Sequence, residues 1–578
     1  ISMVIHRCLL NLSLIIFLGG VCSIHIRIPE VGSGAVENVL SRLPVWVSNE
    51  FSEIIITNDG HKLESGSARL VGTPNGLKVE AASPVDALFA IHSYIREYCG
   101  ASVTWAGSNL PKHASCDRPD IFEKEYSAPK IRYFGNPITY SISLPFADWN
   151  QWEELIDWLA LNGFNMVLTP VGQEALWRQV WIDQGLSPKA VDYFFTGPAF
   201  SAWNRLGHIQ HLGGPVSKDY FDSQLELNKK IVGRMNELGI VPVLPTFAGF
   251  VPDEFVRVNS GLQFIKRCKG FNVSCVSSLH PEEPAFHKIA NAFMEAQDKV
   301  YGKHATRVFS ADPANFSTRK ANEIVSVGKA ILNGCGPNCT WMVQSTTFAD
   351  WQSDEIEALM SSVPKGRMIV LDMKAERRQV HRETADFYGH AFVWCMEHNK
   401  GGNAQMRGHL GKIQEEFIGS ATMSKSMIGA GLTMEGIDQN YIVYQYFIDL
   451  IWATDEIDPF YWIEKYVYSR YGKKDKSAVD AWRRIIATYY THIDDQSAFA
   501  IYHRPNISTD MGEEHFEFQP SHMGHVKNIF EKLNHTYGHN ALFRSLCNQR
   551  SKIRSYITDK TSVISVENSF NVRSSMLI

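Results

Sequence analysis

The 578-residue chain lacks the features that mark several large classes of protein. It has no block of Lys and Arg, and its 56 basic and 61 acidic residues leave a formal net charge of −5, so the electrostatic footprint of a nucleic-acid binder is missing. Beyond residue 23, no segment holds the ~18 uninterrupted apolar residues of a membrane helix. No repeat recurs at a solenoid period. With 44% hydrophobic and 20% charged residues, the composition is that of a large globular protein.

Metal-binding patterns are also lacking, because no pair of cysteines has the tight Cys-x-x-Cys spacing with histidine partners that zinc sites show. Two close pairs, Cys268/Cys275 and Cys335/Cys339, are better interpreted as short disulfide loops of an oxidising compartment. We therefore expect no metal site. The eight cysteines after the leader stand at positions 99, 116, 268, 275, 335, 339, 395 and 547.

The first 23 residues are typical of a cleavable signal peptide. The apolar run Leu14–Leu18 follows His6 and Arg7, and small residues follow it at Gly19–Ser23. The chain begins with Ile-Ser before Met3, as translation of an incomplete transcript would explain. We expect a protein of the secretory pathway, lysosomal or extracellular. Candidate glycosylation sequons begin at Asn272, Asn315, Asn338, Asn506 and Asn534.

From residue 126 to 445, short apolar runs alternate with longer amphipathic stretches, which predicts an α/β fold with a (β/α)8 TIM barrel. A doubly wound open sheet is the alternative, but no glycine-rich phosphate loop follows any run. The predicted strands are 131–134, 164–169, 240–246, 307–311, 341–345, 368–371, 391–395 and 427–432. Helical patterns between them include 149–161, 223–238, 284–300 and 354–360.

Two further domains flank the predicted barrel. Residues 24–125 read as a small N-terminal α/β domain with strands at 52–57 and 68–71 and a helix at 84–98, followed by a linker over 99–125. Residues 446–578 read as an all-α C-terminal domain that need not be complete, with helical patterns at 444–454, 462–471 and 479–493.

Polar and aromatic residues gather where the predicted strands end. The carboxyl ends of barrel strands converge on one pocket, and amides, carboxylates and aromatic faces together suit a sugar. The alternative is that such residues only cap helices and solvate loops. The candidates for substrate binding are Asn136, Gln173, Glu174, Asp312, Asn315, Trp394, His398 and Asn399. Further strand-end residues are Thr139, Phe247, Gly249, Phe250, Gln344, Asp372, Glu376, Asn403, Glu435, Asp438 and Asn440.

The sequence resembles the α-N-acetylglucosaminidase family, exo-glycosidases that remove terminal α-linked N-acetylglucosamine from heparan sulphate in lysosomes. The resemblance runs from about residue 85 to about 490. It is carried by DWNQWEELIDWLALNGFN, GQEALW, FFTGPAFSAWNRLG, VPVLPTFAGFVP, FVWCMEHNKGGN and LTMEGIDQN. It implies a small N-terminal α/β domain, a (β/α)8 barrel and a C-terminal helical domain, and a reaction that needs no metal or organic cofactor.

The resemblance also implies two catalytic glutamates, a nucleophile and a general acid/base, as in other retaining glycosidases. Met-Glu-Gly-Ile matches the nucleophile's motif, which gives that role to Glu435. The acid/base belongs to an Ala-Asp-x-x-Asn-Glu motif, and here the segment reads Ala-Asp-Pro-Ala-Asn-Phe, with Phe316 at the glutamate's place. Phenylalanine exchanges no proton, and loss of general acid catalysis typically costs about 10²–10⁴-fold in rate. A nearby carboxylate such as Asp312 is the remaining substitute.

Other pocket positions depart from the family pattern while core-type positions match it. The departures stand at Ile142, Phe146-Ala147, Pro170-Val171, Phe250, Ser345-Thr346, Glu397 and Lys400. They favour a glycosidase homologue that is impaired in hydrolysis and retained for binding a glycan with terminal N-acetylglucosamine. The alternatives are an active retaining α-N-acetylglucosaminidase that uses another acid, and a structural or interaction protein of the secretory pathway.

Overall fold

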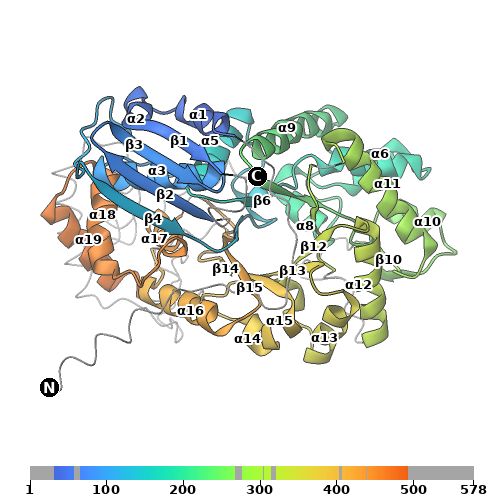
Figure 1. Ribbon diagram of the computed structural model, residues 1–578. Helices are drawn as coiled ribbons and strands as arrows, with labels where there is room; N and C mark the ends of the chain where they lie inside the picture. Colours follow the sequence, from blue (N-terminus) through green and yellow to red (C-terminus); the bar gives the residue numbers. More distant parts are fainter. Residues whose placement is uncertain are drawn as a thin grey trace, which may run out of the picture.

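The computed structural model describes residues 32–57, 66–266, 276–303, 305–313, 320–401, 406–437 and 439–491 of the chain. The signal peptide, the pair Cys268/Cys275, Phe316 and the sequons at Asn272, Asn315, Asn506 and Asn534 lie outside these residues, as do Asn403, Asp438 and Cys547. The described part has a closed barrel at its centre, with a small sheet and a group of helices beside it (Figure 1).

Eight parallel strands form the barrel, which confirms the predicted (β/α)8 fold. Their hydrogen-bonded order closes the ring, because β11 pairs with both β7 and β12. Every predicted run contributes one strand, and β13 and β14 are buried at all positions, as expected for strands covered on both faces. The strands are β5 Ile131–Phe134, β6 Met166–Leu168, β7 Val241–Pro245, β11 Val308–Ser310, β12 Thr340–Gln344, β13 Met368–Met373, β14 Ala391–Met396 and β15 Met427–Leu432.

The helices that connect successive strands surround the barrel. The helix α5 begins where Asp148 and Gln151 form a capping box, and α11 begins with Pro284 in its first turn. The helices are α4 Thr139–Ile142, α5 Trp149–Leu161, α6 Gln173–Asp183, α7 Pro188–Phe194, α8 Ser201–Arg205, α9 Lys218–Glu237, α10 Asp253–Val258, α11 Pro284–Tyr301, α12 Ala321–Cys335, α13 Ser353–Ser362, α14 Val380–Glu383, α15 Ala385–Gly389 and α16 Leu410–Met423, with 3₁₀ turns η2 Pro198–Phe200 and η4 Ser345–Phe348. A short antiparallel sheet also joins β8 Phe250–Val251, β10 Ser277–Leu279 and β9 Phe264–Lys266.

The N-terminal part is a four-stranded sheet in the order β1-β3-β2-β4 that packs on α3. The prediction of α3 at residues 84–98 is confirmed to the residue, and Ser83 accepts a hydrogen bond as its N-cap. The interpretation of 99–125 as a linker is wrong at its end, because β4 begins at Phe122 and forms an edge of the sheet. The elements are α1 Gly34–Leu40, α2 Val45–Glu50, β1 Phe51–Ile56, β2 Ser67–Thr73, β3 Gly76–Ala81, α3 Pro84–Tyr98 and β4 Phe122–Ser127.

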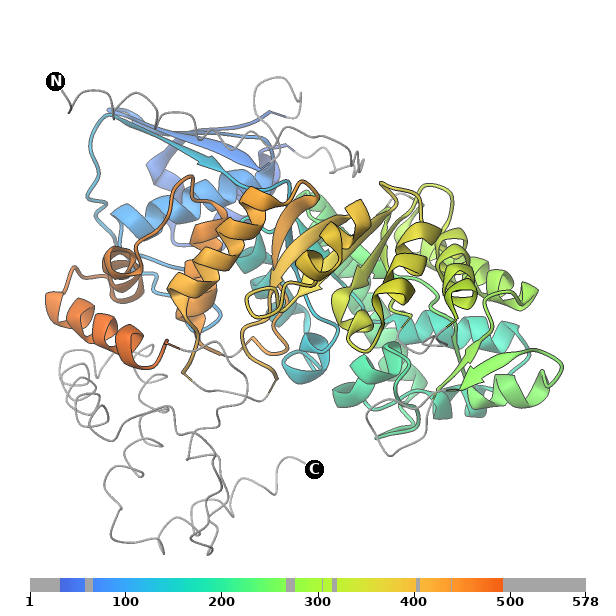
Figure 2. The same ribbon diagram turned by 90° about the horizontal axis from the view of Figure 1, so that it is seen from below.

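The C-terminal helices lie on the same side of the barrel as this sheet (Figures 1 and 2). They are α17 Tyr441–Ile451, α18 Pro459–Tyr471 and α19 Lys476–Thr488. Arg96 on α3 forms a bidentate ion pair with Asp449 on α17, and the rings of Phe89 and Trp452 stack at 4.0 Å. Among the described helices, none combines the length and apolar character that crossing a bilayer requires.

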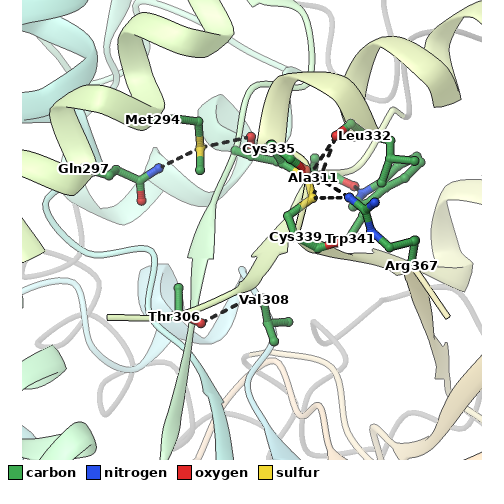
Figure 3. The surroundings of a disulfide bond; sticks show 12 residues. Met294, Gln297, Thr306, Val308, Ala311, Leu332, Cys335, Cys339, Trp341 and Arg367 are labelled. Atoms are coloured by element: carbon green, nitrogen blue, oxygen red, sulfur yellow. Dashed lines mark hydrogen bonds between the residues drawn. A yellow bond between two sulfur atoms is a disulfide. The ribbon is translucent and has the colours of Figure 1, made fainter. Parts of the chain in front are cut away.

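Disulfides connect Cys335 with Cys339 and Cys99 with Cys116. The first was predicted, and Figure 3 shows it at the end of α12 beside Leu332 and Arg367. The Arg367 guanidinium donates to the backbone oxygens of Cys339 and Gly336, which ties this loop to the residue before β13. The sequon residue Asn338 is exposed in the same turn.

Candidate functional site

Glu435 lies three residues beyond the end of β15, at the carboxyl-terminal face of the barrel. It is half-buried, and its Oε2 accepts a hydrogen bond of 2.7 Å from the backbone N–H of Gly401, in the loop after the neighbouring strand β14. Parallel strands of a barrel end at one face, which explains why loops far apart in sequence meet here. The residue to which the resemblance gives the nucleophile's role is therefore held by the main chain.

The connection after β5 fixes the backbone before Glu435. Asn136 donates from Nδ2 to Thr433 O at 3.0 Å, and its Oδ1 accepts from the N–H of Ile138. Thr139 donates its hydroxyl to Met434 O at 2.5 Å. Both polar atoms of the Asn136 amide are thus used inside the protein. The structure brings Asn136 to the predicted site, where it positions the segment that carries Glu435.

A second carboxylate, Glu397, directly follows β14 and is almost fully buried, with 1% of its side chain exposed. Its Oε1 lies 3.4 Å from Nζ of Lys374 and 4.0 Å from the guanidinium of Arg377. Burial raises the pKa of Glu397 to about 8, and the charges of Glu435 and Glu376 act in the same direction while the two cations oppose them. Glu397 therefore carries a proton at neutral pH.

The third carboxylate, Glu376, accepts hydrogen bonds from two backbone N–H groups. Its Oε1 accepts from the N–H of His398 at 2.8 Å and its Oε2 accepts from the N–H of Glu397 at 3.3 Å. These bonds hold a tight turn, since His398 has a φ of +61°. Glu376 was predicted only as one strand-end residue among many, and the structure gives it the role of shaping the turn after β14.

His398 is buried and uncharged at this site. Burial, with Arg407 and Arg377 nearby, holds its pKa well below the usual range. Its Nε2 lies 3.0 Å from Nδ2 of Asn440, so the neutral ring accepts a hydrogen bond from the Asn440 amide, and the rings of His398 and Tyr444 meet edge to face at 5.3 Å. The predicted residues His398 and Asn399 thus lie in the same loop as Gly401, with Asn399 Oδ1 accepting from Arg407 at 2.6 Å.

Two other predicted residues, Gln173 and Glu174, form hydrogen bonds within the connection after β6. Gln173 donates to Pro170 O at 3.1 Å, at the start of α6. Glu174 accepts two hydrogen bonds from the Arg205 guanidinium, at 2.7 and 3.1 Å, and the side chains of both residues are 12% exposed. The Glu174 carboxylate is therefore neutralised by a partner on α8.

Asp312, the suggested substitute acid, is fully occupied. Its two oxygens accept from the backbone and side-chain N–H groups of Gln344, at 2.9 and 2.7 Å, and from the Thr347 hydroxyl at 3.2 Å. Burial raises its pKa, and these donors oppose that shift. All three contacts come from donors, so Asp312 ties the end of β11 to β12 and to the turn that follows it.

Trp394 does not line the pocket, contrary to the prediction. Successive side chains of a strand point to opposite faces, and Trp394 packs outward against Phe417 of α16 and Phe447 of α17 at 5.4 and 5.2 Å. Its strand partner Asp372 also avoids the pocket and binds His381 at 2.6 Å. The residues that sequence reasoning missed are Lys374 and Arg377. The departure at Glu397 was the signal that could have pointed to them.

Comparison with known proteins places these features in a family. Residues 132–454 match the model of the alpha-N-acetylglucosaminidase (NAGLU) TIM-barrel domain, and residues 462–546 match the model of its C-terminal domain. Human alpha-N-acetylglucosaminidase is 33% identical over 450 residues, covering 75% of this chain. The chain spans 59% of the length of that relative.

Solved structures show the same likeness. A family 89 glycoside hydrolase from Clostridium perfringens, in complex with 2-acetamido-1,2-dideoxynojirimycin, superposes with a TM-score of 0.80 at 26% identity, covering 89% of this chain and 59% of the other. A variant of the bacterial enzyme, in complex with its substrate GlcNAc-α-1,4-galactose, gives the same TM-score and coverage at 25% identity.

Proposed function

Because the chain belongs to the alpha-N-acetylglucosaminidase family, we propose that it is a glycosidase homologue that binds a glycan ending in N-acetylglucosamine and hydrolyses natural glycosides poorly. The observation that carries this proposal is Phe316, which stands where the family motif has the acid/base glutamate. The nucleophile's position keeps Glu435, with its carboxylate held by Gly401.

The contacts of the neighbouring acidic groups support the proposal. A retaining mechanism needs a second carboxyl about 5–5.5 Å from the nucleophile, which first protonates the leaving group and then activates water. Asp312 follows the same strand as Phe316, but its oxygens are occupied by Gln344 and Thr347. Without a general acid, only a leaving group that departs unprotonated is expelled readily.

The test uses an activated aryl α-N-acetylglucosaminide, such as the 2,4-dinitrophenyl glycoside. Wild-type protein is expected to release about one equivalent of phenol in a burst and then to stall, because no base activates water for the second step. Azide, which needs no base, is expected to restore turnover. The Glu435→Gln variant should lose the burst, and Phe316→Glu should gain steady turnover of the aryl glycoside.

Full turnover of GlcNAc-α-1,4-galactose by the wild-type protein, lost in Glu435→Gln, would contradict the proposal. If Phe316→Glu folds but gains no turnover of the aryl glycoside, the other departures in the pocket limit hydrolysis as well. The apolar side chains of Ile142 and Phe146, which are 41% and 73% exposed, are the next to revert.

A second candidate, an active enzyme with another acid, is favoured by one observation. Glu397 holds a proton at neutral pH and lies within the electrostatic reach of Glu435. Against it, the Glu397 side chain is 1% exposed and lies against Lys374, so its carboxyl group is not accessible to a ligand in this conformation. Loss of natural-substrate turnover in Glu397→Gln, with the aryl burst kept, would favour this candidate.

The same homologue is proposed to act in the secretory pathway, in lysosomes or outside the cell. The sequence of residues 1–23, the disulfide at Cys335–Cys339 and the exposed sequon residue Asn338 support this placement. Expression in cultured cells should yield a protein whose mass falls on treatment with an N-glycosidase. Retention of the unmodified chain in the cytosol would contradict it.

A further inference from the structure

The turn between α12 and β12 combines a glycosylation sequon with a disulfide. Asn338, Cys339 and Thr340 form the sequon, and its middle residue, Cys339, is bonded to Cys335. Asn338 is exposed in the turn, whereas the two cysteines are each 4% exposed. Modification of Asn338 and closure of the disulfide therefore involve the same short segment.

The third residue of the sequon, Thr340, is the first residue of β12 and is 6% exposed. Its N–H donates to Arg307 O at 2.7 Å, which joins it to the residue before β11. The next residue, Trp341, is fully buried and donates from Nε1 to Ala311 O at 2.8 Å (Figure 3). Because a sequon requires a hydroxyl group at its third position, an enzyme that glycosylates Asn338 must also contact Thr340. The folded barrel prevents that contact.

The disulfide restrains the sequon even before the barrel is complete. It holds the Cα atoms of Cys335 and Cys339 5.9 Å apart, whereas four residues of extended chain span about 13–14 Å. In the folded protein Arg367 adds to this restraint, because it donates to the backbone oxygens of Cys339 at 2.6 Å and Gly336 at 2.9 Å. A glycosyl transferase needs a free segment that presents the amide and the hydroxyl of the sequon together, and the disulfide loop is not free.

We propose that Asn338 is a glycosylation site whose occupancy is set by competition with closure of the Cys335–Cys339 disulfide. The glycan is added only while the two cysteines are still thiols. This inference rests on the secretory placement proposed above, because the transferase and the oxidant both belong to that pathway.

The two reactions use different groups of the turn. In glycan transfer, Nδ2 of Asn338 forms a bond to the anomeric carbon of a lipid-linked oligosaccharide, the bond from that carbon to the pyrophosphate of the lipid breaks, and the amide nitrogen loses a proton to a base of the transferase. In closure, the two thiols lose two electrons and two protons to the disulfide of a thiol oxidoreductase and form the S–S bond. A glycosylated chain still closes its disulfide, because Asn338 is exposed in the folded turn. Only the reverse order is blocked.

The order of synthesis makes the disulfide the first competitor of glycan transfer. The barrel closes only after β15, which ends at Leu432, whereas the two cysteines are four residues apart and can react once both are in the lumen. At about 5–20 residues per second, Leu432 follows Thr340 by about 5–20 s. Disulfide formation takes seconds or longer, so the thiols close on the same timescale as the sequon is accessible.

The experiment expresses the full chain in cultured secretory cells and measures the occupancy of Asn338 by mass spectrometry, after an N-glycosidase in heavy-oxygen water has labelled each occupied asparagine. We expect partial occupancy in the wild type. Cys335→Ser leaves the sequon intact and should raise occupancy about twofold, as removal of a competitor of similar rate does. Dithiothreitol during synthesis should raise the wild type to the level of Cys335→Ser and leave that variant unchanged.

The matched control is Cys99→Ser, which removes the disulfide to Cys116 and leaves this turn intact. It should keep the wild-type occupancy of Asn338, which separates closure of this loop from a general delay in folding. Equal occupancy in the wild type and Cys335→Ser, an equal rise in Cys99→Ser, or an Asn338 without glycan in every variant would overturn the proposal.

Failure of the secretory placement gives a different result. A chain that its own residues 1–23 do not deliver to the lumen lacks glycans at every sequon, and fusion to the signal peptide of another secreted protein then allows the same comparison. The turn precedes β12 at the amino-terminal face of the barrel, opposite the face where Glu435 follows β15. Asn338→Gln should therefore leave the aryl-glycoside burst unchanged.

Discussion

The backbone N–H of Gly401 donates to Oε2 of Glu435 at 2.7 Å, so the loop after β14 orients the carboxylate that follows β15. The same loop begins with Glu397, whose pKa is raised in part by the charge of Glu435, and is shaped by Glu376. Substitutions in residues 397–401 are therefore expected to change the environment of Glu435 even where they do not contact it.

The first prediction concerns Gly401 itself. A Cβ there would lie 2.9 Å from Cγ1 of Ile142 on α4, so Gly401→Ala must displace either the isoleucine or the loop. We expect the aryl-glycoside burst to slow about tenfold, which is about 1.4 kcal/mol, because the donor to Glu435 moves. Ile142→Ala should restore the rate in the double variant. Additive effects of the two changes would contradict the direct contact.

The second prediction concerns the pH dependence of stability. The pKa of Glu397 in the folded protein is about 8, above its value in an unfolded chain, so the folded state holds this proton more tightly. Stability from this group is present at pH 4 and is lost as the pH rises toward 8. Glu397→Gln should remove this loss, which amounts to at most about 5 kcal/mol.

Urea unfolding at several pH values measures this effect. The stability of Glu397→Gln relative to wild type should rise from pH 5 to pH 8 and then level off. Any free-energy cost of the amide that does not vary with pH shifts all values of this difference equally and leaves its change with pH unaffected. A difference that is flat with pH would show that Glu397 titrates normally.

The third prediction separates structure from chemistry at Asp312. An amide at this position keeps one oxygen and replaces the other by an NH₂ group that faces a donor of Gln344, so Asp312→Asn should destabilise the protein by about 1–3 kcal/mol. If Asp312 were the acid, the variant would lose natural glycosides while keeping activated ones. We expect no such selective loss. Burst kinetics with leaving groups of different pKa distinguish the two outcomes.

The barrel could be predicted from the sequence because each strand is a short, mainly apolar run that is buried at most or, as in β13, at all of its positions. The edge strand β4 was missed because FEKEYS is largely charged, and only its period-two exposure marks a strand. The position of Glu435 followed from the family motif. Trp394 lies on the face of β14 that packs against α16 and α17. This packing is a tertiary contact that the local sequence pattern does not predict.

The pairing of Lys374 with Glu397 could not be predicted either. The two residues follow different strands, and only the closure of the barrel brings the ends of β13 and β14 together. Comparison with the family pattern identified Glu397 as a departure but did not identify Lys374 as its partner. Lys374 itself has a φ of +63°, a conformation that lysine rarely adopts and that the sequence does not predict.

The last prediction concerns the contact between the N-terminal sheet unit and the barrel. Arg132 in β5 pairs with Asp86 on α3, and their side chains are 1% and 0% exposed. Arg132 also donates to the backbone oxygens of Gly163 and Pro129. Removing one member of a buried pair leaves an uncompensated charge, which typically costs about 3–5 kcal/mol. Arg132→Met should therefore lower the free energy of unfolding by that amount.

The matched variant is Arg69→Met, which removes an exposed arginine of β2 that pairs with Glu123. Exposed pairs contribute about 0–1 kcal/mol, so this control should unfold nearly as the wild type does. Adding Asp86→Asn to Arg132→Met removes the stranded carboxylate and should recover part of the loss. If Arg132→Met unfolds like the control, Arg132 and Asp86 do not connect the two parts of the fold.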